Sequence, residues 1–183
     1  MLTAEKKKFT KEDYQSLGEG AAFQLINADL VMSPSPTSYH QILSARIFKL
    51  IDSYLEQFNV GGICLFAPLD VHLDDENIFQ PDLIYIPEVR KAELVKDCIE
   101  GAPDLIIEIL SPATAYYDLR QKKDVYERYG VKEYIIIDPI QLNGEVYSLE
   151  NGLFLLRQKA GKSELLQSVL LKGLEIDLNL LFK

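Results

Sequence analysis

The most constraining feature of the sequence is a short apolar run with one acid inside it. Residues 105–110 read Leu-Ile-Ile-Glu-Ile-Leu, so every position except Glu108 is aliphatic. A run of this length without polar alternation is typical of a central strand that is covered on both faces. The chain must therefore place layers on both sides of this strand, and it must supply a partner for the carboxylate inside it.

Periodicity around this run predicts an α/β fold. Apolar residues recur at three- and four-residue steps over 38–58, which predicts a long amphipathic helix that stops before Gly61 and Gly62. A second helix is predicted over 114–129, with Gly130 just after its end. We expect a mixed central sheet with the long helix on one face and the second helix on the other. Further short strands are predicted at 63–67, 70–73, 82–86 and 133–138.

The two ends of the chain are predicted to add a short helix and more β structure. Residues 10–17 are predicted to form a helix with Thr10 as its N-cap, and residues 23–32 a hairpin that turns near Asn27. Three segments near the other end, 145–149, 153–157 and 164–169, have the pattern of a β-meander. Because no repeat or low-complexity linker interrupts the chain, we expect one domain over 1–183, with an N-terminal arm at 1–20 and a C-terminal β extension at 143–183.

Composition excludes several classes of protein. Hydrophobic residues make up 48% and charged residues 26% of the chain, which argues against a disordered, collagen-like or coiled-coil protein. No apolar run approaches the ~20 residues that span a bilayer, and the Lys-rich start lacks the apolar segment of a signal peptide. We therefore expect a cytoplasmic protein with no membrane partner. Cys64 and Cys98 have neither zinc nor disulfide spacing, and we interpret them as ordinary buried thiols.

The net charge of −9 is spread unevenly along the chain. Residues 66–108 carry eleven acidic and three basic side chains, whereas residues 118–132 carry five basic and three acidic ones. The overall acidity weighs against strong binding to phosphates, because such affinity comes from Lys and Arg. The acidic segment followed by a basic helix indicates a localised site rather than a uniformly acidic surface.

Two carboxylates lie in strands that are poor places for charge. Asp82 opens the apolar strand of Gln80-Pro-Asp-Leu-Ile-Tyr-Ile, and Glu108 sits inside its own strand. Burying an ionised carboxylate costs several kcal/mol unless a cation or hydrogen bonds compensate. A purely structural interpretation stays open for both residues. Asp82 could be satisfied by backbone amides at the strand start, and Glu108 could belong to a buried ion pair.

The helix after the Glu108 strand offers the cation. At 100° per residue, Lys122 and Asp118 fall on the same face as the apolar Val125 and Tyr129, whereas Lys123 points toward solvent. An acid and a lysine thus interrupt the buried stripe of this helix. The simplest alternative is a surface i,i+4 pair worth only ~0.3 to 0.5 kcal/mol. The inward position favours a contact between Lys122 and Glu108 instead.

These residue types point to metal-assisted phosphodiester hydrolysis. Carboxylates on adjacent strand ends can hold Mg²⁺ through hard oxygen ligands. The metal lowers the pKa of a water and neutralises charge on a phosphoryl oxygen, while a nearby ammonium orients the water or stabilises the developing charge. His40 and His72 have no ligand-like spacing. We interpret His40 as a helix-start residue and His72 as an outward strand residue, neither of them catalytic.

Several motifs resemble a known family when they are taken in order. The helix, strand and acid order is similar to the core of the PD-(D/E)xK restriction-endonuclease-like nucleases. More closely, the chain resembles the bacterial putative-restriction-endonuclease family, formerly a domain of unknown function. The shared motifs are Met32-Ser-Pro-Ser-Pro36 followed by His40, Gln80-Pro-Asp82, the 103–112 segment Pro-Asp-Leu-Ile-Ile-Glu-Ile-Leu-Ser-Pro, Asp118 followed by Lys122 and Tyr126, and Gly130-Val-Lys-Glu-Tyr134 through Asp138-Pro139.

The resemblance implies a restriction-endonuclease-like fold and a role for each matched residue. Asp82 and Glu108 correspond to the metal ligands and Lys122 to the catalytic lysine, and the backbone carbonyl of Ile109 is a further ligand in such sites. The expected cofactor is Mg²⁺, with Mn²⁺ as a substitute. The residues expected to support these groups are Gln24, Gln80, Asp118 and Tyr126.

Two positions depart from the family patterns. The superfamily places its lysine two residues after the second acid, where this chain has Leu110, so the ammonium must come from Lys122. The close family usually carries a Glu in the first hairpin strand, where this chain has Gln24. An amide can bind a water or a lysine but brings no negative charge.

Three functions remain as hypotheses. The leading one is a Mg²⁺-dependent DNA endonuclease, and the second is an inactive nuclease-like module that binds or assembles, with Asp82, Glu108 and Lys122 as a structural cluster. A two-carboxylate glycosidase is disfavoured because the chain has no Trp. Only Arg120, Lys123, Arg128 and the Lys6–Lys8 tail offer positive charge, so we expect weak, metal-dependent DNA binding. A homodimer would suit double-strand cutting.

Overall fold

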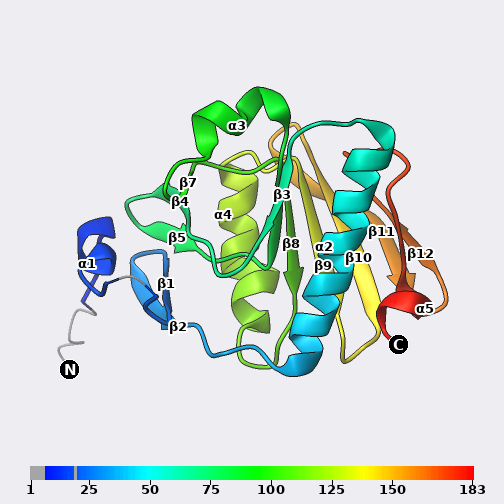
Figure 1. Cartoon of the computed structure of the whole chain (residues 1–183). Coiled ribbons are helices and arrows are strands. Elements are labelled where there is room, and N and C mark those ends of the chain that lie inside the picture. The colour runs from blue at the N-terminus through cyan, green and yellow to red at the C-terminus, as the bar shows by residue number, and fades with distance from the viewer. Residues whose placement is uncertain (1–6, 19) are drawn as a thin grey trace.

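The computed structural model describes residues 7–18 and 20–183 and is organised around a six-stranded mixed sheet (Figure 1). Strand β8 (Leu105–Ile109) is parallel to β9 and antiparallel to β6, and all five of its residues are buried. The predicted central strand is therefore confirmed. In spatial order the sheet contains β11 (Leu153–Gly161), β10 (Asn143–Glu150), β9 (Glu133–Asp138), β8, β6 (Leu83–Ile86) and β3 (Ile63–Phe66).

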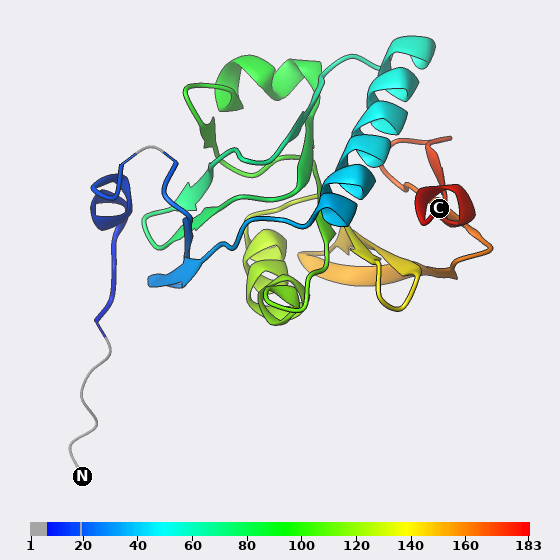
Figure 2. The same cartoon turned by 60° about the horizontal axis from the view of Figure 1, so that its bottom comes forward.

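Two helical segments cover opposite faces of this sheet (Figures 1 and 2). Helix α2 (Ser38–Phe58) has the predicted bounds, begins after the N-cap Thr37 and ends at Asn59 in the left-handed region. Its buried stripe runs through Leu43, Ile47, Ile51 and Leu55, which pack against β8 and its neighbours in one apolar cluster. A second cluster, on the other face, contains Val125 and Tyr126 of the helix that follows β8.

The predicted helix over 114–129 divides into two parts. Its first part, η1 (Tyr117–Lys122), is π-helical, and its second, α4 (Lys123–Arg128), is α-helical. Such wide turns are rare and occur frequently at functional sites. Asp118 and Lys122 both point inward and are buried, as predicted. The prediction for Tyr129 was wrong, because α4 ends one residue earlier and Tyr129 is exposed, with its hydroxyl donating to Asp74.

The N-terminal hairpin does not extend the central sheet. Strands β1 (Phe23–Ile26) and β2 (Asp29–Met32) join a second, five-stranded sheet, because Leu25 pairs with Ile78 of β5. This sheet has the order β2, β1, β5 (Asn77–Phe79), β4 (Val71–Asp74) and β7 (Ile99–Glu100). Helix α1 (Lys11–Gln15) has Thr10 as its N-cap, as predicted. Residues 1–6 and 19 of the predicted arm lie outside the described residues, Lys6 among them.

The C-terminal segment only partly follows the predicted meander. Strands β10 and β11 continue the central sheet as an antiparallel pair. The third segment, β12 (Leu165–Gln167), pairs instead with β13 (Glu175–Asp177) in a separate two-stranded sheet that leads into α5 (Leu178–Leu181). Helix α3 (Glu88–Leu94) lies between β6 and β7, where no helix was predicted. Among the described residues, no helix is long and apolar enough to cross a membrane.

Two residues differ from their predicted environments. His72 was expected to point outward, but it is buried, with a relative exposure of 7%. It lies in the same cross-strand row as Ile78 and Leu25, which pack with Tyr14 of α1, so this face of the second sheet is covered. Cys64 is buried as expected, whereas Cys98 is only partly buried.

Glu133 at the start of β9 anchors the C-terminal segment. Its carboxylate accepts hydrogen bonds from Ser168 Oγ at 2.6 Å, Val169 N at 2.5 Å and Leu170 N at 2.8 Å. Burial raises the pKa of Glu133 above its ordinary value, and these three hydrogen bonds oppose that rise. The carboxylate thus satisfies two backbone amides that the turn at 168–170 would otherwise leave unpaired.

We predict that Glu133→Ala lowers the free energy of unfolding by about 2 kcal/mol, because two amides lose their acceptor while the cost of burying the carboxylate is relieved. Urea denaturation followed by circular dichroism measures the change. Glu93→Ala, on the exposed side of α3, is the control and should change stability by less than ~0.5 kcal/mol. Equal effects of the two substitutions would contradict the anchoring role.

Candidate active site

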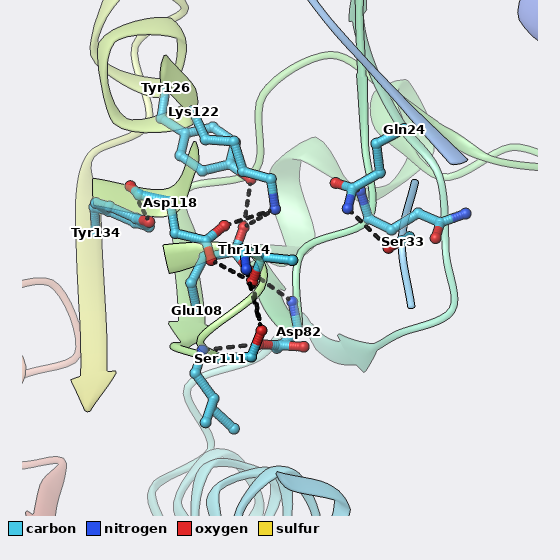
Figure 3. A network of polar contacts seen from close by, with 12 residues as sticks. Gln24, Ser33, Asp82, Glu108, Ser111, Thr114, Asp118, Lys122, Tyr126 and Tyr134 are labelled. Carbon is cyan, nitrogen blue, oxygen red and sulfur yellow. Dashed lines mark hydrogen bonds and ion pairs between the residues drawn. The ribbon is translucent and has the colours of Figure 1, made fainter. Parts of the chain in front are cut away.

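Asp82 and Glu108 meet at one end of the central sheet. Because Leu83 of β6 pairs with Ile107 of β8 in an antiparallel register, Asp82 lies opposite Glu108. The Asp82 backbone N–H points to Glu108 Oε2 at 3.4 Å, and the Asp82 Oδ2 atom accepts a hydrogen bond from Ile109 N at 2.7 Å. The sheet register thus brings together the two acids that stood out in the sequence (Figure 3).

Lys122 supplies the cation that the Glu108 carboxylate requires. Its Nζ atom lies 3.0 Å from Glu108 Oε1 and 2.9 Å from Asp118 Oδ1, and all three side chains are 3% exposed. Tyr126 donates a second hydrogen bond to Glu108 Oε1 at 2.8 Å. The two oxygens of Glu108 therefore have different surroundings, with Oε1 held by the helix and Oε2 directed to Asp82.

The pKa shifts follow from burial and from the excess of acids. Burial raises the pKa of Glu108 well above its ordinary range; Lys122 opposes this shift, and the Asp118 and Asp82 carboxylates add to it. Burial alone would lower the pKa of Lys122, but Asp118 and Glu108 more than compensate and hold it above its usual value. Lys122 is thus a permanent ammonium near neutral pH, in a cluster where acids outnumber it.

A chain of hydroxyl groups fixes Asp118. Thr114 Oγ1 donates to Asp118 Oδ2 at 3.1 Å, and Ser111 Oγ lies 2.9 Å from Thr114 Oγ1. The Tyr134 hydroxyl donates to the backbone carbonyl of Asp118 at 3.0 Å. Sequence reasoning missed these three residues. For Ser111 and Thr114 the sequence signal was their position directly between the Glu108 strand and the Asp118 helix.

His40 also lies in this site, although its sequence spacing gave it no role there. Its Nε2 atom is 3.0 Å from the carbonyl oxygen of Ile109 and 3.2 Å from Asp82 Oδ2. Burial lowers the His40 pKa, but the Asp82 carboxylate and the Ile109 carbonyl raise it to a value above the ordinary one. The sequence signal for His40 was its position just after the Met32–Pro36 motif, with which it resembles the family pattern.

The two glutamines occupy different positions. Gln24 is buried, its Oε1 atom accepts from Gln80 N at 2.8 Å, and its Nε2 atom donates to Ser33 Oγ at 3.0 Å. The Gln80 side chain turns away from the acids and donates to Asp70 Oδ1 at 2.9 Å. In Figure 3, Gln24 faces Lys122 from the side of the hairpin. Gln80 therefore supports the site through its backbone N–H group and not through its side-chain amide.

A cavity of about 720 Å³ gives access to these groups. The 33–37 loop and the 111–114 turn form part of its wall, and Asp82, Glu108 and Lys122 lie along it. The donors around Asp82 are the hard oxygens that Mg²⁺ prefers, namely two carboxylates and the Ile109 carbonyl. The residues present therefore fit such an ion, provided that the imidazole of His40 releases the Ile109 carbonyl.

Comparison with a solved structure supports the fold. A crystal structure of a putative nuclease belonging to DUF820 from Anabaena variabilis ATCC 29413 is similar to this chain with a TM-score of 0.78. The two sequences are 18% identical, and the alignment covers 95% of this chain and 97% of that one. A search of curated proteins found no match.

Comparison with family models supports the assignment that the sequence motifs suggested. The model of the Uma2 family, described as putative restriction endonucleases, matches residues 11–179. This match includes all three sheets, the cavity and every site residue described above. The chain therefore belongs to the Uma2 family of putative restriction endonucleases.

Proposed function

We propose that this protein is a Mg²⁺-dependent endonuclease that hydrolyses phosphodiester bonds in DNA. The observation that carries the proposal is the buried Lys122 ammonium, held between Glu108 and Asp118 at the point where Asp82 faces Glu108. Membership of a family of putative restriction endonucleases supports the nuclease class and DNA as the substrate.

Three groups would hold the metal ion. They are the carboxylate of Asp82, the Oε2 atom of Glu108 and the carbonyl oxygen of Ile109, all of which are hard oxygen donors. When bound, Mg²⁺ polarises a phosphoryl oxygen and lowers the pKa of water, and Mn²⁺ has similar preferences. The Glu108 Oε1 atom stays with Lys122 and Tyr126, so the same carboxylate links the ion to the ammonium.

Lys122 orients the attacking water and stabilises charge. Because its pKa lies above the ordinary value, it does not act as a general base near neutral pH. An ammonium has three N–H donors. Glu108 and Asp118 take two of them, and we assign the third to the water or to the phosphoryl oxygen where negative charge develops. Asp118, Tyr126 and Tyr134 keep this ammonium in place.

Positive charge for the DNA backbone is scarce. Arg120 and Arg128 are exposed, but Lys123 is partly buried, with its Nζ atom 3.4 Å from the centre of the Tyr147 ring. The expectation that Lys123 points freely to solvent was therefore wrong. Because the net charge of the protein is −9, we propose that it binds DNA weakly, in a way that is sensitive to salt and depends on the metal. A symmetric homodimer would present one site to each DNA strand.

A second candidate is a nuclease-like module without turnover, which acts by binding or assembly. Gln24 stands where the family usually has a Glu, and His40 Nε2 is bonded to the Ile109 carbonyl that the ion requires. The ion pairs of Lys122 with Glu108 and Asp118 also satisfy these charges without a metal. In this case the cluster is structural.

We predict that Glu108→Gln abolishes Mn²⁺ binding and plasmid cleavage, because the amide removes the charge of one ligand while keeping its shape. Isothermal titration calorimetry and a plasmid-nicking assay measure the two effects, and circular dichroism reports folding. Asp82→Asn, at a less buried position, should give the same losses. Glu93→Gln on α3 is the matched control. Unchanged Mn²⁺ affinity in both site variants would contradict the assignment.

We predict that Lys122→Met lowers the cleavage rate by about 10²–10³-fold while Mn²⁺ still binds, because the ammonium acts on the transition state. Single-turnover cleavage and calorimetry separate the two effects. Lys123→Met is the control for the same change one residue away. If the cluster is only structural, Lys122→Met changes stability alone, and the unmodified protein leaves DNA uncut with every divalent ion.

A further inference from the structure

Three side chains with metal-binding groups converge on the second sheet, away from the candidate active site. His72 of β4 pairs in register with Glu100 of β7, and the two strands are parallel. Cys98 lies two residues before Glu100, and its Sγ atom donates a hydrogen bond to Glu100 Oε1 at 3.3 Å. One ligand atom from each of His72, Cys98 and Glu100 lies within 4.8 Å of the other two.

The imidazole of His72 is the second observation that points to a ligand. The side chain is 7% exposed, and its Nδ1 atom has no hydrogen-bond partner among the described residues. This buried nitrogen lies 3.7 Å from Glu100 Oε1, on the side of Cys98 and Glu100. The fold thus leaves the Nδ1 atom of His72 as an unsatisfied donor or acceptor. A buried polar atom without a partner is costly.

The opposite side of the His72 ring faces another carboxylate. Its Nε2 atom lies 4.0 Å from Asp70 Oδ2, and Asp70 is held by Tyr14 Oη at 3.0 Å and Gln80 Nε2 at 2.9 Å. Histidines that bind metals commonly face a carboxylate with the other ring nitrogen, which orients the ring and fixes its tautomer. Asp70 stands in this relation to His72.

We propose that His72 Nδ1, Cys98 Sγ and Glu100 Oε1 form a binding site for one Zn²⁺ ion, with water completing the coordination. Zn²⁺ takes this mixture of nitrogen, sulfur and oxygen ligands, whereas Mg²⁺ prefers oxygen alone. At ~2.0–2.3 Å from zinc, tetrahedral ligand atoms lie about 3.3–3.8 Å apart. The 3.7 Å from His72 to Glu100 and the 3.3 Å from Cys98 to Glu100 match this spacing.

Charge balance also favours a divalent ion here. When Zn²⁺ binds, the Cys98 thiol releases its proton to solvent, and the thiolate and Glu100 carboxylate together offset the charge of the ion. Without the ion, the Lys11 Nζ atom lies 3.6 Å from Glu100 Oε1. Lys11 is at the start of α1, so its side chain can withdraw from Glu100 without any change in the sheet.

The site is separate from the nuclease centre and acts on the frame around it. The proposed zinc site contains none of Asp82, Glu108 and Lys122. The ion would join the edge strand β7 to β4, and through Asp70 it would steady Gln80, whose backbone amide holds Gln24. The role of the ion is therefore to stabilise the second sheet and not to take part in hydrolysis.

Cobalt substitution tests the proposal on the reduced full-length protein. Co²⁺ occupies zinc sites, and a cysteine ligand gives it a thiolate charge-transfer band in the near ultraviolet. The candidate active site contains no cysteine, so Co²⁺ bound there cannot produce this band. We predict a band that saturates at one equivalent of Co²⁺ and disappears when Zn²⁺ is added.

Variants assign the band to individual ligands. Cys98→Ser should abolish it, whereas Cys64→Ser, which changes the other cysteine, should retain it. His72→Gln and Glu100→Gln should each weaken Co²⁺ binding, and Asp70→Asn should weaken it by ~10–100-fold while keeping the sulfur band. The Glu108→Gln variant should keep the band, which separates this site from the nuclease proposal. No band in the unmodified protein, or a band that persists in Cys98→Ser, would overturn the proposal.

Discussion

The buried ion pair between the Lys122 ammonium and the Glu108 carboxylate is the interaction on which the rest of the structure depends. Without it, Glu108 would be an uncompensated carboxylate inside a central strand, at a cost of several kcal/mol. Its position in turn requires the π-helical turn η1 on one face of the sheet and the hydroxyl groups that hold Asp118. Removal of one partner from a buried pair costs more than the pair contributes, so these elements depend on one another.

The strongest local patterns in the sequence predicted the core. The apolar run around Glu108 and the periodicity of α2 depend on burial of whole faces, and the angle between Asp118 and Lys122 depends on helix geometry alone. Strand β5 and helix α3 both escaped prediction. The strand did so because it is very short and is formed by long-range pairing. His40 escaped because its partner, the Ile109 carbonyl, is 69 residues away and a backbone atom has no sequence signature.

Part of the acidic charge of the chain lies in two separate clusters. Part of it surrounds Lys122, where Asp82, Glu108 and Asp118 outnumber the single ammonium, a surplus that a divalent cation would reduce. Another part belongs to Asp70 and Glu100 on the second sheet, beside His72 and Cys98. These two clusters account for part of the net charge of −9, and the charge as a whole weighs against strong nucleic-acid binding.

A crystal structure of the protein soaked in Mn²⁺, with anomalous diffraction data, tests the central claim most directly. The account predicts an ion at about 2.0–2.2 Å from Asp82, Glu108 Oε2 and the Ile109 carbonyl. It also predicts that His40 Nε2 leaves the Ile109 carbonyl, which it contacts at 3.0 Å without the ion, while Lys122 stays on Glu108 Oε1. A map without anomalous density between the two acids, and with His40 still on the Ile109 carbonyl, would contradict it.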